Sequence, residues 1–262
     1  MAYRFANTTD DINYGDPGIF DGLTALTLLF RVKFAAVNLA LGMLYDWSST
    51  DSSDRRFQFG SSDDLSDEIL FDVWDTGGSN RWIAKTSDAN LTTGVVYALA
   101  VTWAQPSTTV FYRDGTLLTV GTTSGAGVAS INSGGAGSDS YQIGERPSAS
   151  LSAADMTVYE VAAWNRVLTA GEIAQLTKYS ALFIPRGLIS YPQLIRGAND
   201  IKAGLTGTVT GATVAVHDAA VVYPSRPRVQ KWAAGAALST TVGRLVNRGL
   251  ITGGLVGGRL VA

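Results

Sequence analysis

The chain has 262 residues, of which 46% are apolar and 16% are charged, so it is long and apolar enough to bury one substantial core. It contains no cysteine, which excludes disulfide bonds and thiolate metal sites. All 22 acidic residues lie before position 219, together with 14 of the 20 basic ones. An acidic body of net charge −8 therefore precedes a tail of net charge +6.

The N-terminal residues, MAYRFANTTDDINYG, contain neither a basic stretch nor an apolar run, so no export signal is expected. No window of 18 residues is apolar throughout, so no membrane span is expected either. Together with the missing cysteines, these features predict a protein that is made and folded in the cytoplasm.

Short apolar or alternating runs predict a series of β-strands. Residues 24–34 read as a core strand that ends in alternation, with Arg31 and Lys33 on one face and Val32 and Phe34 on the other. Further strands are predicted at residues 39–47, 56–60, 69–74, 81–85, 95–103 and 156–164.

A tight hairpin is predicted at Asp114-Gly115, which lies between the two apolar runs of VFYRDGTLL. Asp-Gly readily adopts the positive φ angles of a type I′ turn. Strands that recur about every 8–12 residues, with such turn signals between them, are typical of a β-sandwich.

One short helix is predicted directly after the strand at residues 156–164. Thr169 and Glu172 have the spacing of a capping box, in which the Thr hydroxyl accepts the Glu172 N–H and the Glu carboxylate accepts the Thr169 N–H. Ile173 and Leu176 then give this helix a single apolar face.

The end of this strand and the start of the helix contain a recognisable sequence motif. The residues are Glu160-Val161, Trp164, Asn165-Arg166-Val167-Leu168-Thr169 and Glu172-Ile173. They resemble the closing strand and helix of the laminin-G-like, concanavalin-A-like jelly roll, which the segments 13–16 and 95–103 resemble as well. The resemblance covers about residues 1–180 and implies an all-β fold: an antiparallel β-sandwich jelly roll with one short helix.

The chain divides into three segments. Residues 1–182 form the jelly-roll sandwich. Residues 183–225 resemble one further strand and loop of the family. The segment is too short for a second domain, so it forms either accessory strands or a connector. Residues 226–262 form an extended, Gly-rich arm with the near-repeat Gly-Arg-Leu-Val at 243–246 and 258–261.

The arm is basic, and glycine and arginine separate its apolar pairs without a sustained helical or strand period. Such a segment cannot build a core alone, yet its apolar pairs need a partner surface. We expect it to dock on a neighbouring subunit. The alternatives are that it folds back on its own sandwich or is a frayed terminus. The residues expected at a subunit contact are Arg244, Leu245, Val246, Arg248, Leu250, Ile251, Leu255, Val256, Arg259, Leu260 and Val261.

The sequence offers little catalytic chemistry, so we expect no enzyme. Laminarinase-type relatives carry catalytic carboxylates in a Glu-x-Asp-x-x-Glu strand, and the nearest match here is Glu68 with Asp72. These two would lie about 13 Å apart on an extended strand, whereas glycosidases need roughly 5–9.5 Å. We interpret them as acids that solvate one sheet face. His217, the only histidine, has no Gly-x-Ser-x-Gly motif to accompany it.

Calcium is the one cofactor that the resemblance suggests, because laminin-G-like domains often bind it at the rim of the sandwich through Asp and Asn oxygens. Tyr159 stands where the family frequently has Asp, and solvated loop acids are the alternative interpretation. The candidate ligands are Asp10, Asp11, Asp16, Asp63, Asp64 and Asp75.

Two functions remain. The arm and the missing export signal favour a non-enzymatic structural protein of a phage virion, such as a capsid decoration protein that binds other virion subunits and forms homo-oligomers. The alternative is a carbohydrate-binding module, such as a tail-fibre receptor binder or a bacterial lectin. In that case Trp47, Trp74 and Trp82 are the candidates for stacking on a glycan. We expect no nucleic-acid partner.

Overall fold

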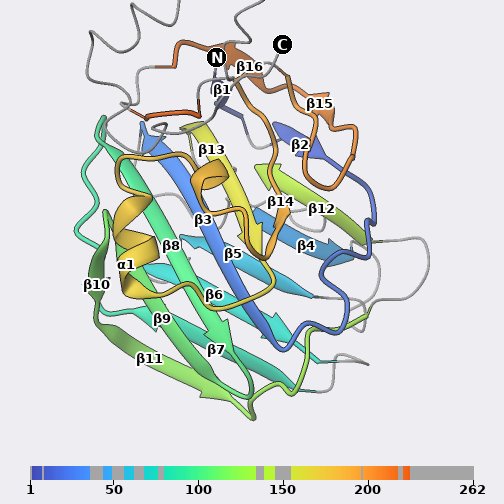
Figure 1. Cartoon of the computed structure of the whole chain (residues 1–262), viewed down its shortest axis with the longest axis vertical. Helices are drawn as coiled ribbons and strands as arrows, with labels where there is room; N and C mark the ends of the chain where they lie inside the picture. Colours follow the sequence, from blue (N-terminus) through green and yellow to red (C-terminus); the bar gives the residue numbers. More distant parts are fainter. Residues whose placement is uncertain are drawn as a thin grey trace, which may run out of the picture. The chain divides into compact units, whose positions relative to one another are not determined.

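The computed structural model describes residues 2–7, 9–35, 44–48, 56–61, 68–75, 80–133, 139–144, 155–195, 197–217 and 221–224, with the backbone alone at 44–48, 61 and 139–140. All of them belong to the unit Met1–Pro224. They form two antiparallel β-sheets that face each other (Figure 1). The predicted all-β, antiparallel jelly-roll sandwich is confirmed.

Sheet A contains the strand at residues 156–164, which has the motif of the laminin-G-like family. Its strands follow the order β10-β9-β8-β3-β13-β1-β16, and β14 pairs with β13 beside this path. Their bounds are β1 Ala2–Phe5, β3 Ala25–Phe34, β8 Val96–Ala104, β9 Thr108–Arg113, β10 Thr116–Leu118, β13 Met156–Trp164, β14 Leu188–Ser190 and β16 Thr213–Ala215.

Sheet B lies against sheet A across the core. Its strands follow the order β11-β7-β6-β5-β4-β12-β2-β15. Their bounds are β2 Asp11–Asn13, β4 Leu44–Ser48, β5 Phe57–Ser61, β6 Ile69–Trp74, β7 Arg81–Thr86, β11 Val120–Gly125, β12 Asp139–Gly144 and β15 Thr208–Thr210.

The predicted strands are present, and their ends differ by little. Those predicted at 69–74 and 156–164 are β6 and β13 without change. At 39–47 the described strand begins only at Leu44, because residues 39–43 lie outside the described residues.

The core lies between the sheets and is filled by alternate residues of their strands. In β3, Phe30 and Val32 are fully buried in it, whereas Leu29 and Arg31 face the outer side of sheet A. The alternation predicted for this strand is therefore confirmed.

The predicted hairpin joins β9 to β10. Asp114 has φ 49° and Gly115 has φ 75°, the two positive angles that a type I′ turn requires. The Asp114 carboxylate also accepts the Ala98 N–H at 2.8 Å, which ties the turn to β8.

The predicted helix is α1, Ala170–Gln175, and its capping box is confirmed. The Glu172 N–H donates to the Thr169 hydroxyl at 3.2 Å, and the Thr169 N–H donates to the Glu172 carboxylate at 2.9 Å. Ile173 and Leu176 are buried in an apolar cluster with Leu29 on the outer face of sheet A. Among the described residues, no helix has the length and apolarity to span a membrane.

Residues from the segment 183–225 add strands to both sheets. β14 pairs with β13 and β16 pairs with β1, which extends sheet A, while β15 pairs with β2 at the edge of sheet B. In Figure 1 this orange stretch runs across the upper part of the sandwich. The short 3-10 helix Ala181–Phe183 precedes it.

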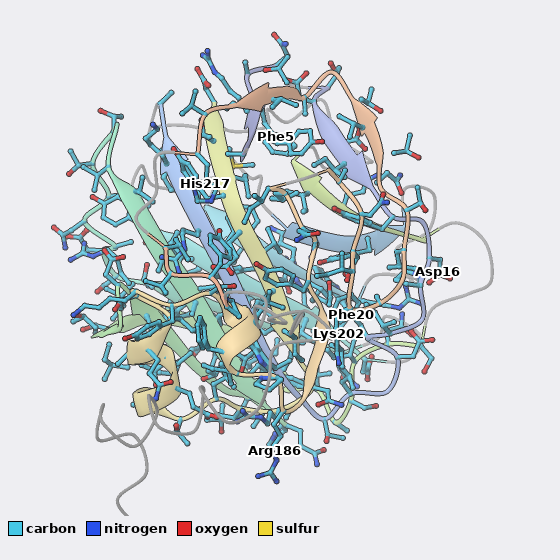
Figure 2. All side chains as sticks on the ribbon, turned by 45° about the horizontal axis from the view of Figure 1, so that its top comes forward. Phe5, Asp16, Phe20, Arg186, Lys202 and His217 are labelled. Atoms are coloured by element: carbon cyan, nitrogen blue, oxygen red, sulfur yellow. The ribbon has the colours of Figure 1, made fainter. Side chains whose placement is uncertain are left out.

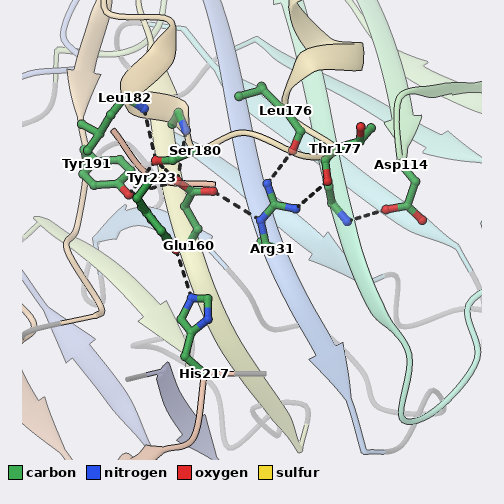
Figure 3. A network of polar contacts seen from close by, with 12 residues as sticks. Arg31, Asp114, Glu160, Leu176, Thr177, Ser180, Leu182, Tyr191, His217 and Tyr223 are labelled. Atoms are coloured by element: carbon green, nitrogen blue, oxygen red, sulfur yellow. Dashed lines mark hydrogen bonds and ion pairs between the residues drawn. The ribbon is translucent and has the colours of Figure 1, made fainter. Parts of the chain in front are cut away.

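A buried ion pair fastens the segment after α1 to the outer face of sheet A (Figure 3). Arg31 of β3 and Glu160 of β13 are register partners, and their charged atoms lie 3.3 Å apart with side-chain exposures of 4% and 1%. The guanidinium also donates to the carbonyls of Leu176 and Thr177 just past α1. It thereby satisfies carbonyls that a helix end leaves without intrahelical partners.

The other carboxylate oxygen of Glu160 organises the next part of the chain. It accepts the Ser180 hydroxyl at 2.6 Å, the Ala181 N–H at 3.0 Å and the Tyr191 hydroxyl at 3.0 Å. Burial raises the pKa of Tyr191, so this phenol stays protonated and donates. One carboxylate thus holds the start of the 3-10 helix and the end of β14 at the same point.

The capping box should make a measurable contribution to the free energy of unfolding. Thr169→Ala removes the acceptor for the Glu172 N–H and leaves the apolar face of α1 intact, so we expect the free energy of unfolding to fall by about 1 kcal/mol. The measurement is urea denaturation. The control Thr93→Ala, at an exposed turn position, should change it by less than about 0.5 kcal/mol. Equal effects of the two substitutions would contradict the role of the cap.

The buried ion pair should contribute far more to the free energy of unfolding than an exposed pair with the same distance between its charged atoms. Glu160→Ala leaves the buried Arg31 charge without its carboxylate, so we expect a loss of about 3–5 kcal/mol on unfolding. The matched control is Asp155→Ala, because Asp155 lies 3.3 Å from Arg4 with side-chain exposures of 30% and 52%. We expect about 0–1 kcal/mol there. Similar losses in both variants would mean that burial does not set the value of the pair.

Candidate functional site

A line of polar residues crosses the outer face of sheet B. Antiparallel register places Asn13 of β2 opposite Gln142 of β12, Gln142 opposite Tyr45 of β4, Tyr45 opposite Gln58 of β5, and Gln58 opposite Asp72 of β6. Directly paired residues share one face of a sheet. We call the four side chains of Asn13, Gln142, Gln58 and Asp72 the polar row.

The local sequence explains why these residues face away from the core. Gln58 stands between Phe57 and Phe59, and both phenylalanines are fully buried between the sheets. Gln142 stands in the same way between Tyr141 and Ile143. Because side chains alternate along a strand, the two glutamines must point to the outer face.

The two glutamines at the centre of the row are unusual in their burial. Gln58 is 3% exposed and Gln142 is 6% exposed, and no hydrogen bond joins either side-chain amide to a described residue. Neither amide is among the fully buried polar atoms that lack a partner, so the low exposure is that of the whole residue. A side-chain amide that no neighbouring group satisfies can bond to water or to a polar ligand. Strand β4 separates the two glutamines, so a ligand that bonds to both amides must span three strands.

Asp72 is the only carboxylate of the row, and it is held by a neighbour. It is 0% exposed, and it accepts two N–H groups, from Nε and Nη2 of Arg81. The Arg81 guanidinium also lies 4.9 Å from the centre of the Trp74 ring. The interpretation of Asp72 as a solvated surface acid is therefore wrong, because the side chain is buried in an ion pair.

The three tryptophan candidates lie in different environments. Trp74 is 3% exposed and covered by Arg81, so it has no open ring face for a sugar. Trp82 packs against the sandwich core and donates its indole N–H to Thr109 at 3.0 Å, on the opposite face from the row. Trp47 is described through its backbone alone, which pairs with Ser140 of β12.

Two calcium candidates near β2 bond within the chain. Asp10 is 2% exposed, and one of its oxygens accepts the N–H groups of Ala6 and Asn7 at 2.8 and 3.0 Å. Burial raises the pKa of Asp11, although a hydrogen bond with the Thr210 side chain lowers it.

Two further candidates also have partners. Asp16, labelled in Figure 2, lies on the loop that leads to the buried Phe20 and is 2.9 Å from a guanidinium nitrogen of Arg56. Asp75 accepts the backbone N–H of Asn80 at 2.8 Å. Over the described ranges, no three acidic or histidine side chains gather as a metal site. Asp63 and Asp64 lie outside the described residues.

His217 is part of an aromatic contact rather than a catalytic triad. Its Nε2 lies 3.0 Å from the Tyr223 hydroxyl, and its ring packs edge-on against Tyr159 at 5.2 Å. Burial lowers the pKa of His217, which favours the neutral ring. The predicted subunit contacts in the arm, from Arg244 to Val261, lie outside the described residues.

Comparison with solved structures finds the same fold in proteins of low sequence identity. A candidate carbohydrate-binding protein from Bacteroides ovatus matches with a TM-score of 0.61 at 15% identity, over 85% of this chain and 62% of that one. The heptameric SAP-like pentraxin of Limulus polyphemus matches with a TM-score of 0.51 at 12% identity, over 84% and 97%.

The CBM40 of the Ruminococcus gnavus IT-sialidase, solved with α2,3-sialyllactose, matches with a TM-score of 0.50 at 14% identity, over 67% of this chain and 96% of that one. No curated protein matches the sequence. A family model does match it over residues 6–174, which is more than half of the chain and includes every strand of the polar row. The chain therefore belongs to the concanavalin A-like lectin/glucanases superfamily.

Proposed function

We propose that this protein is a non-catalytic carbohydrate-binding domain whose glycan lies across the polar row of sheet B. The observation that carries the proposal is that Gln58 and Gln142 share one sheet face and that no hydrogen bond joins their side-chain amides to a described residue. A side-chain amide both donates and accepts, as a sugar hydroxyl does. Hydroxyls of a bound glycan would therefore satisfy both groups at once.

The two ends of the row are more accessible to a glycan than its centre. Asn13 is half-buried at one end, where its neighbour Thr208 on β15 is exposed. At the other end the side chain of Arg81 is 46% exposed beside the buried Asp72. The enclosed centre supplies hydrogen bonds that water competes for less, which strengthens them.

The similar structures support a binding role. The Bacteroides ovatus protein is described as a candidate carbohydrate binder, and the Ruminococcus gnavus CBM40 was solved with a sialyllactose. The chain spans 62% of the length of the first of these. Catalysis is disfavoured by the row itself: glycosidases use two carboxyl groups, and the described row holds one, already paired with Arg81.

The proposal predicts that the two glutamines contribute directly to binding. Gln58→Ala and Gln142→Ala should each weaken glycan binding about tenfold, because each removes hydrogen bonds worth about 1–1.5 kcal/mol. A glycan array identifies a binding oligosaccharide, and titration calorimetry then measures the variants. The matched control is Gln175→Ala, an exposed glutamine of α1. Equal affinities for the row variants and the wild type would contradict the proposal.

We propose a second role for residues 226–262. Residues 219–262 carry a net charge of +6 and no acidic residue, and the arm contains repeated Leu and Val pairs. These features suit attachment to a neighbouring subunit with an acidic surface. In this role the protein is a structural component of a phage virion, and the arm joins it to the particle while the sandwich is displayed. The charge and composition of the arm are what support this role.

A truncated chain tests the second role. A protein ending at Ser225 should fold and stay soluble, because all described strands lie before that residue, and it should fail to join virus particles. Binding of full-length chain should weaken but persist at high salt, since salt screens the arginine contacts and leaves apolar contacts intact. Incorporation of the truncated chain at the full-length level would contradict the role of the arm.

A further inference from the structure

We propose that the polar row selects uncharged glycans and rejects those that place a carboxylate or sulfate against it. This inference rests on the proposed carbohydrate-binding function and concerns the chemical class of the ligand. It follows from how the charges of the outer face of sheet B are arranged.

The cation nearest to the row is already neutralised. Arg81 donates from both Nε and Nη2 to the Asp72 carboxylate, and Trp74 lies against its flat face. Recognition of an anionic sugar commonly relies on a guanidinium that offers two parallel N–H groups. Here that pair of donors points at a side chain of the protein itself, even though the Arg81 side chain is 46% exposed.

The second cation of this face, Lys85, is also engaged. On β7 it stands opposite Leu70 of β6, two residues along the strand from the register of the row, and it has an interaction within the chain. Arg81 is therefore compensated by Asp72, and Lys85 is not without a partner.

The remaining groups of the row favour hydroxyls over acids. Gln58, Gln142 and Asn13 are neutral and can both donate and accept. The Asp72 carboxylate at the end of the row is buried and compensated by Arg81. An acidic group placed at the centre of the row would therefore meet neutral amides and lose its hydration without gaining a cation.

The sequence of a flanking connection reinforces this charge balance. The chain between β5 and β6 carries Asp63, Asp64, Asp67 and Glu68 and no basic residue. A net negative charge in this part of the sequence lowers the local concentration of anionic ligands around it.

The test compares oligosaccharides that differ by one acid group. The full-length protein is titrated with lactose and 3′-sialyllactose, and with xylohexaose and its glucuronic-acid-substituted form, by calorimetry at low and at 0.5 M salt. We expect the neutral member of any bound pair to bind at least tenfold more tightly, with an affinity that salt does not change. Equal or tighter binding of the acidic member overturns the inference and leaves the proposed function standing.

Absence of binding in all four titrations and on a wider glycan array overturns the proposed function and this inference together.

Where a pair of oligosaccharides binds, a variant tests the role of charge. Asp72→Asn keeps the size of the side chain and releases Arg81, so we expect the ratio of the affinities for the acidic and the neutral member to rise about tenfold. A thermal melt checks that the variant is folded.

If Asp72→Asn does not fold, Gln58→Lys serves instead, because it adds a cation to the row and keeps the Asp72–Arg81 pair. The same rise in the ratio of the two affinities is expected, although loss of the Gln58 amide weakens binding of both oligosaccharides. A folded variant of either kind whose preference remains that of the wild type overturns the inference. The control Gln175→Lys adds the same charge on α1 and should leave the preference unchanged.

Discussion

The ion pair between Arg31 and Glu160 is the constraint on which the arrangement of this domain depends. It joins the two central strands of sheet A, β3 and β13, at directly opposed positions. From there the pair binds the carbonyls at the end of α1, the start of the 3-10 helix and the hydroxyl of Tyr191. A buried pair is tolerated only when such additional hydrogen bonds complete it.

The outer faces of the two sheets differ in the bonding of their polar groups. The groups around Arg31 and Glu160 on the outer side of sheet A are saturated by one another, and the aliphatic side of that face is covered by α1. On the outer side of sheet B the amides of Gln58 and Gln142 have no such partners among the described residues. In the proposed function, the outer face of sheet B is the one that binds the ligand.

The sequence allowed more of the fold to be predicted than of the site. The capping box at Thr169 and Glu172 and the Asp114-Gly115 turn are local, so neighbouring residues alone specify them. The polar row is different, because its members come from four strands and meet only through pairing. A signal was present, since Gln58 and Gln142 each interrupt an apolar strand, but a single polar residue in a strand does not reveal whether it will be satisfied.

The environment of Trp74 and Asp72 shows the same limit. Alternation correctly placed both on one face of β6, away from the core. It did not reveal that Arg81, on the next strand, pairs with the acid and covers the ring. Cross-strand contacts of this kind depend on the register between β6 and β7, which no residue pattern in either strand fixes alone.

The central claim is that the unpartnered amides of sheet B bind the glycan, and the side-chain amide signals in a ¹⁵N-correlated NMR spectrum report on it directly. During titration with a neutral oligosaccharide that binds, the NH₂ signals of Gln58 and Gln142 should shift together and saturate with one affinity. Those of Gln175 on α1 and Gln193 after β14 should stay in place. Shifts confined to Gln175, Gln193 and the residues around Glu160, with the two row glutamines unmoved, would contradict the account.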